Sequence, residues 1–181
     1  MAVAAGLALA FTAACVACLV YLHLAPTGYS PVRNAVSEYG RVGPYARWYR
    51  LQASSLGLAA ICLAVAFRHH GGVAALLCLL AAARIAIGWF PTDAVGARER
   101  TRNGAVHLLL AVVAFTAASW AAILLNRASG GEPALGRVMA VFAVATMVSL
   151  RTGLRPWFGL IERGYYVATI AWLVLVSVRL L

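Results

Sequence analysis

The stretch AVHLLLAVVAFTAASWAAILL, residues 105–125, decides the fold class of this chain. It contains no carboxylate, arginine or lysine, and it is as long as the roughly 20 apolar residues with which a helix crosses a bilayer. Other apolar runs accompany it along the chain. Together these runs predict six membrane-spanning helices, at residues 4–24, 51–67, 73–90, 105–125, 134–150 and 158–180.

The composition of the whole chain of 181 residues supports the same conclusion. Hydrophobic residues make up 64% of it and charged residues 11%, whereas a soluble domain is about half apolar and about a quarter charged. Intrinsic disorder is excluded because disordered segments are poor in apolar residues. The connections between the runs are too short for a soluble domain. We therefore predict one all-α polytopic membrane domain over residues 1–181, a six-transmembrane-helix bundle.

The charged residues predict an orientation in the membrane. All fifteen basic residues are arginine and the acids number five, which gives a formal net charge of +10. Most arginines lie between apolar runs, where anionic lipid headgroups explain them, so we expect no nucleic-acid partner. The loops after the first, third and fifth runs carry ten arginines, and the opposite loops with the C-terminus carry four. The positive-inside rule then predicts arginine-rich loops in the cytoplasm and both termini outside. The alanine-rich, lysine-free composition suggests a bacterial inner membrane.

The polar and charged residues that cost free energy to bury in a membrane lie mostly on the arginine-rich side. The acids there are Glu38, Asp93, Glu99 and Glu162. His107 lies about one turn into the fourth run, and Arg84 lies about 9 Å from the end of the third at 1.5 Å per residue. Charged groups at that depth usually face a cavity or a partner. We expect Arg84 to pair with Asp93 or Glu38. We also expect a cavity with Glu38 and Asp93 on its wall, and with Arg98, Arg100 and Arg155 at its mouth.

The candidate site combines these groups with aromatic side chains at the same level. The candidate catalytic residues are Glu38, Asp93 and His107. The candidate substrate-binding residues are Arg84, Tyr39, Trp89, Phe90, Trp157, Glu162, Tyr165 and Tyr166. Each has an ordinary structural alternative. Trp and Tyr form interfacial belts in any membrane protein, Asp93 could be the N-cap of a short interfacial turn, and Glu162 could be an acid favoured at a helix start.

Motifs for metals and nucleotides are missing from the sequence. It has no Asp-rich D-D-x-x-D run, no H-E-x-x-H, no P-loop and no Rossmann glycine fingerprint. With five scattered acids, a site for a hard metal ion would need two or three of them to converge. We therefore expect no metal and no cofactor.

Short segments carry a resemblance to a known family. NAVSEYG (residues 34–40), FPTD (residues 90–93) and the downstream His107 together resemble a family of small bacterial and archaeal multi-spanning proteins of unknown function. The resemblance covers most of the chain and implies a compact helical bundle, with no activity. In size and layout the chain is also similar to bacterial membrane-embedded terpene cyclases, which are small, multi-spanning, metal-free and acid-dependent. No residue is carried over from them.

Three functions remain open. The first is an enzyme that acts on a prenyl-type or other amphiphilic lipid, in which a buried carboxyl, Glu38 or Asp93, protonates an alkene or epoxide. Arg84 or His107 would orient the reacting groups, and aromatic faces would stabilise the carbocation. The second is a small proton-coupled transporter, since intramembrane acids also form proton relays. The third is a non-catalytic subunit of a membrane complex, and a homo-oligomer is compatible with all three.

Overall fold

The computed structural model describes residues 1–41, 43–128 and 134–181, and these residues form helices and turns without any strand. Glu132 and part of the expected polar loop at 126–133 lie outside the described residues. The helices are α1 (Ala2–Leu24), η1 (Val36–Gly40), α2 (Ala46–Ala66), α3 (Gly71–Ile87), α4 (Arg102–Ala128), α5 (Ala134–Ser149), η2 (Arg155–Trp157) and α6 (Phe158–Val178).

Each predicted apolar run corresponds to one of the long helices, so the expected all-α bundle is confirmed. Within the described residues, α1, α2, α4 and the η2–α6 unit are long and apolar enough to cross a membrane, and α3 and α5 are shorter apolar helices. The 16 residues of α5 extend over about 24 Å at 1.5 Å per residue. Several apolar helices of this kind suggest a membrane protein.

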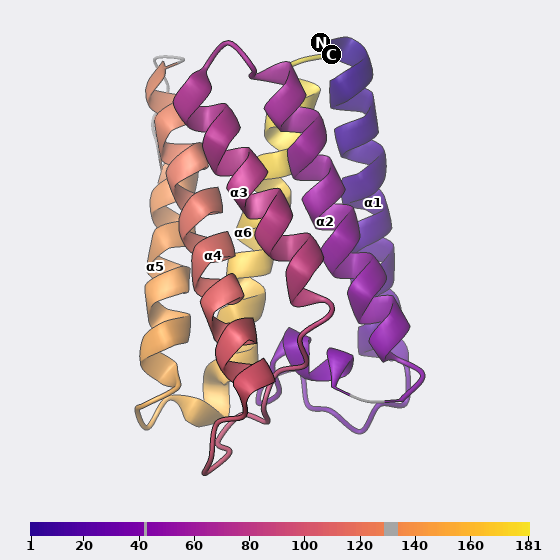
Figure 1. Ribbon diagram of the computed structural model, residues 1–181, viewed down its shortest axis with the longest axis vertical. Helices are drawn as coiled ribbons and strands as arrows, with labels where there is room; N and C mark the ends of the chain where they lie inside the picture. Colours follow the sequence, from indigo (N-terminus) through magenta and orange to yellow (C-terminus); the bar gives the residue numbers. More distant parts are fainter. Residues whose placement is uncertain (42, 129–133) are drawn as a thin grey trace.

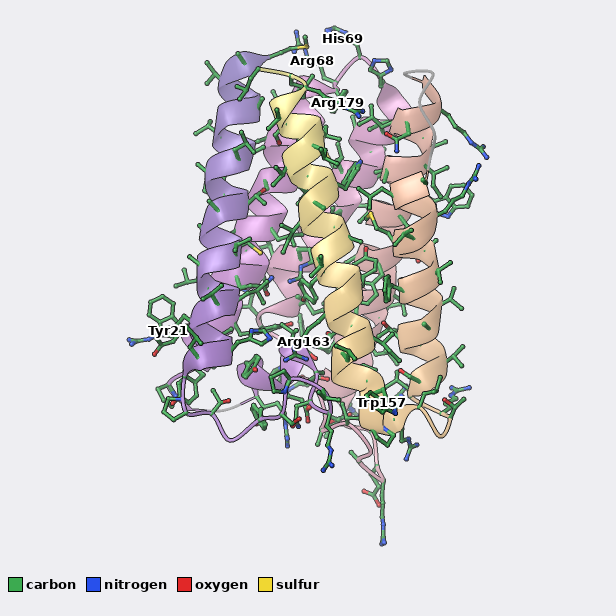
Figure 2. All side chains as sticks on the ribbon, turned by 180° about the vertical axis from the view of Figure 1, so that it is seen from behind. Tyr21, Arg68, His69, Trp157, Arg163 and Arg179 are labelled. Carbon is green, nitrogen blue, oxygen red and sulfur yellow. The ribbon has the colours of Figure 1, made fainter. Side chains whose placement is uncertain are left out.

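The helices form an up-and-down bundle (Figure 1). Each long helix packs against the next one along the chain, and α6 returns to pack against α1. Both termini lie at one end of the bundle (Figure 1), together with Arg68, His69 and Arg179 (Figure 2). Arg163 and Trp157 lie towards the opposite end (Figure 2), which we call the arginine-rich end. It carries the segments at residues 25–41, 88–101 and 150–157.

Two helix ends differ from the expected boundaries for local reasons. The third run was expected to reach Phe90, but α3 ends at Ile87 and the chain tightens into a turn in which Phe90 N–H donates to the Ile87 carbonyl (3.3 Å). Pro91 follows directly, and residues before proline are disfavoured in the helical region. Helix α4 begins at Arg102, before the expected residue 105, because the side chains of Asp93 and Thr101 bond the backbone at its start.

The outward faces of the bundle are apolar. On α5 the exposed side chains include Val138, Val141, Val144 and Val148, at spacings of three or four residues that put them on one face. Water-soluble monomers rarely expose large continuous apolar surface. Inside, the core is built largely from alanine and leucine, with Trp172, Tyr39 and Tyr49 among the largest fully buried side chains. The bundle is therefore apolar both in its core and on its outer surface, which is typical of a protein surrounded by lipid.

Candidate functional site

Glu38 ties together two segments at the arginine-rich end. It is 2% exposed. Its Oε2 accepts hydrogen bonds from the backbone N–H of Ala35 (2.8 Å) and the side-chain amide of Asn34 (3.0 Å). Its Oε1 accepts from the backbone N–H of Val95 (3.1 Å), and Nη1 of Arg41 lies 4.0 Å away. Both carboxylate oxygens of Glu38 therefore accept hydrogen bonds from the protein itself.

Arg163 fastens the same segment to α6. Its Nε donates to Nε2 of His23 on α1 (2.6 Å), Nη1 donates to the Asn34 carbonyl (2.8 Å), and Nη2 lies 3.4 Å from the Tyr39 hydroxyl. Gly159 makes this approach close, because a Cβ there would collide with the carbonyl oxygen of Asn34. The NAVSEYG segment thus covers the start of α6.

Asp93 belongs to the start of α4. Its carboxylate accepts hydrogen bonds from the backbone N–H (3.1 Å) and the hydroxyl (2.8 Å) of Thr101, whose hydroxyl in turn accepts from the N–H of Gly104 (2.9 Å). The carboxylate lies where a Cβ on Gly104 would be. Such contacts satisfy N–H groups that a helix leaves unpaired at its start. Thr101 is therefore the residue that caps α4, and Asp93 holds Thr101 in place.

A cavity of about 590 Å³ lies beside these segments. It runs along α4 from Gly104 to Phe115, about 16 Å at 1.5 Å per residue, and residues of α2, α3, α5 and α6 form its other walls. Its inner lining includes Tyr49, Arg84, His107, Phe115, Glu162 and Tyr166. Its rim at the arginine-rich end includes Asp93, Glu99, Arg100, Arg151 and Arg155. The expected cavity is therefore present with Asp93 on its wall, but the expectation for Glu38 is wrong, because Glu38 is not among the lining residues.

Glu162 and His107 are each held by one backbone group. Oε2 of Glu162, a residue 5% exposed, accepts a hydrogen bond from the N–H of Val36 (2.6 Å). Nδ1 of His107, also 5% exposed, donates to the carbonyl of Phe90 (2.6 Å), which is free because Pro91 ends the helix there. A carbonyl can only accept, so Nδ1 carries the proton and Nε2 of the neutral ring is an acceptor. Within the described chain, neither Oε1 of Glu162 nor Nε2 of His107 has a hydrogen-bond partner.

Arg84 has neutral neighbours. Its Nη2 donates to Oε1 of Gln52 (3.1 Å), whose amide nitrogen donates to the sulfur of Cys15 (3.2 Å). The guanidinium carbon lies 5.2 Å from the centroid of the Tyr166 ring, and Nε is buried without a hydrogen bond. The expected pair with Asp93 or Glu38 is wrong: among the described residues the one acid–arginine contact within 4 Å joins Glu38 and Arg41. Both expected partners are occupied by backbone groups.

The aromatic candidates divide into three groups. Tyr166 lies on the cavity wall. Tyr165 instead stacks on Phe115 (centroids 4.0 Å apart) and donates to its carbonyl (3.0 Å), and Tyr39 is buried against Tyr29. Trp89, which is 67% exposed, and Trp157, which is 53% exposed, lie on the outside of the bundle, and Phe90 contributes its carbonyl to His107. The exposed tryptophans have the position of an interfacial belt.

Some residues of this site were missed in the sequence. Gln52 lies in the second apolar run and Tyr49 just before it, and no motif singles them out; a polar amide inside an apolar run was the available signal for Gln52. No group of three or more His, Cys, Asp or Glu side chains suited to a metal ion occurs within residues 1–41, 43–128 and 134–181. The site is therefore built from a guanidinium, a carboxyl, an imidazole and aromatic rings.

Comparison with known proteins gives one match. The family described as "Protein of unknown function (DUF998)" matches residues 3–179. No curated protein and no solved structure matches the chain.

Proposed function

Since this chain belongs to the DUF998 family of proteins of unknown function, we propose its function from the cavity: a multi-pass membrane enzyme that performs general acid–base chemistry on an amphiphilic, prenyl-type lipid. One observation carries the proposal. Glu162 and His107 lie on the wall of one cavity, each fixed by a backbone group through one atom and unpartnered at the other among the described residues. General acid–base catalysis needs titratable groups that are oriented and still able to exchange a proton with the substrate.

The roles follow from the hydrogen bonds. Glu162 is the proton donor through Oε1, in place of Glu38 and Asp93, whose oxygens are occupied. Protonation of an alkene carbon or an epoxide oxygen leaves a carbocation on the substrate, and the rings of Tyr49, Phe115 and Tyr166 on the same wall favour positive charge. Nε2 of His107 then removes a proton from the substrate. The substrate gains one proton and loses one, so the reaction is an isomerisation or cyclisation.

The shape and lining of the cavity suit an amphiphile. Ligand cavities for small molecules measure about 300–1,000 Å³ and combine apolar walls with a few polar groups. Here Leu108, Ala111 and Met147 provide apolar wall beside the polar groups. We place the arginine-rich end in the cytoplasm of a bacterial inner membrane and both termini outside, following the distribution of arginines. A C-terminal fusion to a reporter enzyme active only outside the cytoplasm tests this orientation, and an inactive reporter contradicts it.

The chemistry is tested by product formation in membranes containing the protein. A polyene and an epoxidised prenyl lipid are supplied, and isomeric products are detected by mass spectrometry. Glu162→Gln should abolish product while the melting temperature in detergent stays near that of the parent, because the glutamine carbonyl can still accept from Val36. Glu99→Gln, on the exposed rim, is the matched control and should retain activity. Full activity of Glu162→Gln would contradict the proposal.

The cavity itself is tested by filling it. Ala111 lines the cavity, whereas its neighbour Val112 is 38% exposed on the outer surface of α4. Ala111→Trp should therefore reduce both product formation and the amount of lipid that co-purifies with the protein, and Val112→Trp should change neither. Equal behaviour of the two variants would show that the cavity does not admit the substrate.

A further inference from the structure

Arg84 is a buried charged residue, and none of the described side chains that contact it carries the opposite charge. It is 3% exposed and lies on α3, within the bundle, on the lining of the cavity. Its identified neighbours, Gln52 and Tyr166, are neutral, and Nε has no hydrogen bond. No carboxylate oxygen lies within 4 Å of it among the described residues. An arginine at this depth is costly and normally has an anionic partner.

None of the described acids forms an ion pair with Arg84 within 4 Å. Glu38 and Asp93 are held by backbone and threonine groups, and Glu162 is bound to the N–H of Val36 without an ion pair to Arg84. The rim adds Arg100, Arg151 and Arg155 to the same cavity. The cavity thus carries three arginines at its mouth and, at its inner end, a guanidinium that forms no ion pair within 4 Å among the described residues.

We propose that Arg84 binds the anionic group of an amphiphile, a phosphate or a carboxylate, at the inner end of the cavity. A planar guanidinium presents parallel N–H donors that fit both groups. Gln52 holds one edge of the guanidinium and the Tyr166 ring lies beside it, so the side chain is oriented before the ligand arrives. The apolar part of the ligand then lies along Leu108, Ala111 and Met147. This inference rests on the proposed function for its use of the same cavity, and it specifies the substrate class.

Binding measured without turnover tests the inference. Native mass spectrometry in an uncharged detergent compares dodecyl phosphate, dodecanoate, dodecanol and inorganic phosphate on the full chain. We expect at least one anionic amphiphile to bind about tenfold or more tightly than dodecanol. Arg84→Met should remove that preference and leave dodecanol binding unchanged. Arg155→Gln, a matched change on the rim, should reduce anion binding less than threefold. Arg84→Gln provides a second variant if Arg84→Met does not fold.

The outcomes separate this inference from the proposed function. Equal binding of dodecanol and both anions, unchanged by Arg84→Met, would overturn the role of Arg84 while the cavity remains an amphiphile site. If no amphiphile binds and Ala111→Trp has no effect, both proposals fail. Binding of inorganic phosphate that competes with dodecyl phosphate and is lost in Arg84→Met would support the anion site and identify a free anion as its source. Competition without dependence on Arg84 would overturn it.

Discussion

Glu38 accepts a hydrogen bond from the backbone N–H of Val95, 57 residues further along the chain (3.1 Å). This contact joins the NAVSEYG segment to the loop that follows FPTD. Two segments that stand apart in the sequence are thereby parts of one structure at the arginine-rich end. Glu38, which the sequence suggested as a catalytic residue, instead holds the wall of the site in place.

Glu38→Gln should therefore destabilise the protein. The glutamine carbonyl can replace one carboxylate oxygen, but its NH₂ group would face a backbone N–H, of Val95 or of Ala35, and leave that donor unsatisfied. An unsatisfied buried donor costs about 1–3 kcal/mol. We expect a lower melting temperature in detergent, with Glu99→Gln unchanged as the control. A Glu38→Gln variant that melts like the parent while losing activity would return Glu38 to the catalytic candidates.

Gly104→Ala should disturb the start of α4. The added methyl group occupies the place of the Asp93 carboxylate, so the hydrogen bonds from Thr101 must lengthen or break. Asp93 thereby loses its hold on Thr101, whose hydroxyl caps α4, and loss of such a cap costs about 0.5–2 kcal/mol. Gly6→Ala is the matched control, because a Cβ there meets nothing within 4 Å and alanine favours a helix more than glycine does. A melting temperature for Gly104→Ala at or above that of Gly6→Ala would contradict the role of Asp93 in holding Thr101 at the start of α4.

Arg163→Lys should destabilise the protein although the charge is kept. The three guanidinium nitrogens reach His23, Asn34 and Tyr39 separately, and one ammonium group cannot reach all three. Each lost hydrogen bond costs about 0.5–1.5 kcal/mol. Limited proteolysis should then cleave within residues 25–41 faster than in the parent. The exposed Arg98 serves as the control, and equal cleavage of Arg163→Lys and Arg98→Lys would contradict the fastening role.

Arg84→Met should leave stability unchanged or raise it. Loss of Arg84 leaves no acid unpaired, because the ion pair with Asp93 or Glu38 that the sequence predicted is not present among the described residues. The substitution removes the desolvation penalty of a buried ion, which is on the order of several kcal/mol. Unfolding in detergent measures this. A large drop in melting temperature would show that Arg84 supports the fold and is not kept for a ligand.

The sequence predicted the helices well, because an apolar run of about bilayer length can form few structures other than a helix. It predicted the start of α2 poorly: residues 46–50 include Arg47 and Arg50 and lack an apolar pattern, yet they are helical because Tyr49 packs in the core. The site was predicted in part. Arg84, His107, Glu162 and Tyr166 do line one cavity. The sequence does not show which carboxylates accept hydrogen bonds from the backbone, because those N–H groups belong to distant loops. The sequence did not point to Gln52, because a neutral amide is a less evident partner for a buried arginine than an acid.

The shortness of α5 has a consequence for the surrounding lipid. Its 16 residues extend over about 24 Å, against a hydrocarbon thickness of about 30 Å. In a bilayer, acyl chains beside α5 must therefore shorten or tilt, since hydrophobic mismatch is relieved by local thinning. Helix α5 is also a wall of the cavity. If the protein acts on a lipid as proposed, a lipid beside this wall would need less free energy to leave the bilayer, and we expect higher activity in membranes of short-chain lipids.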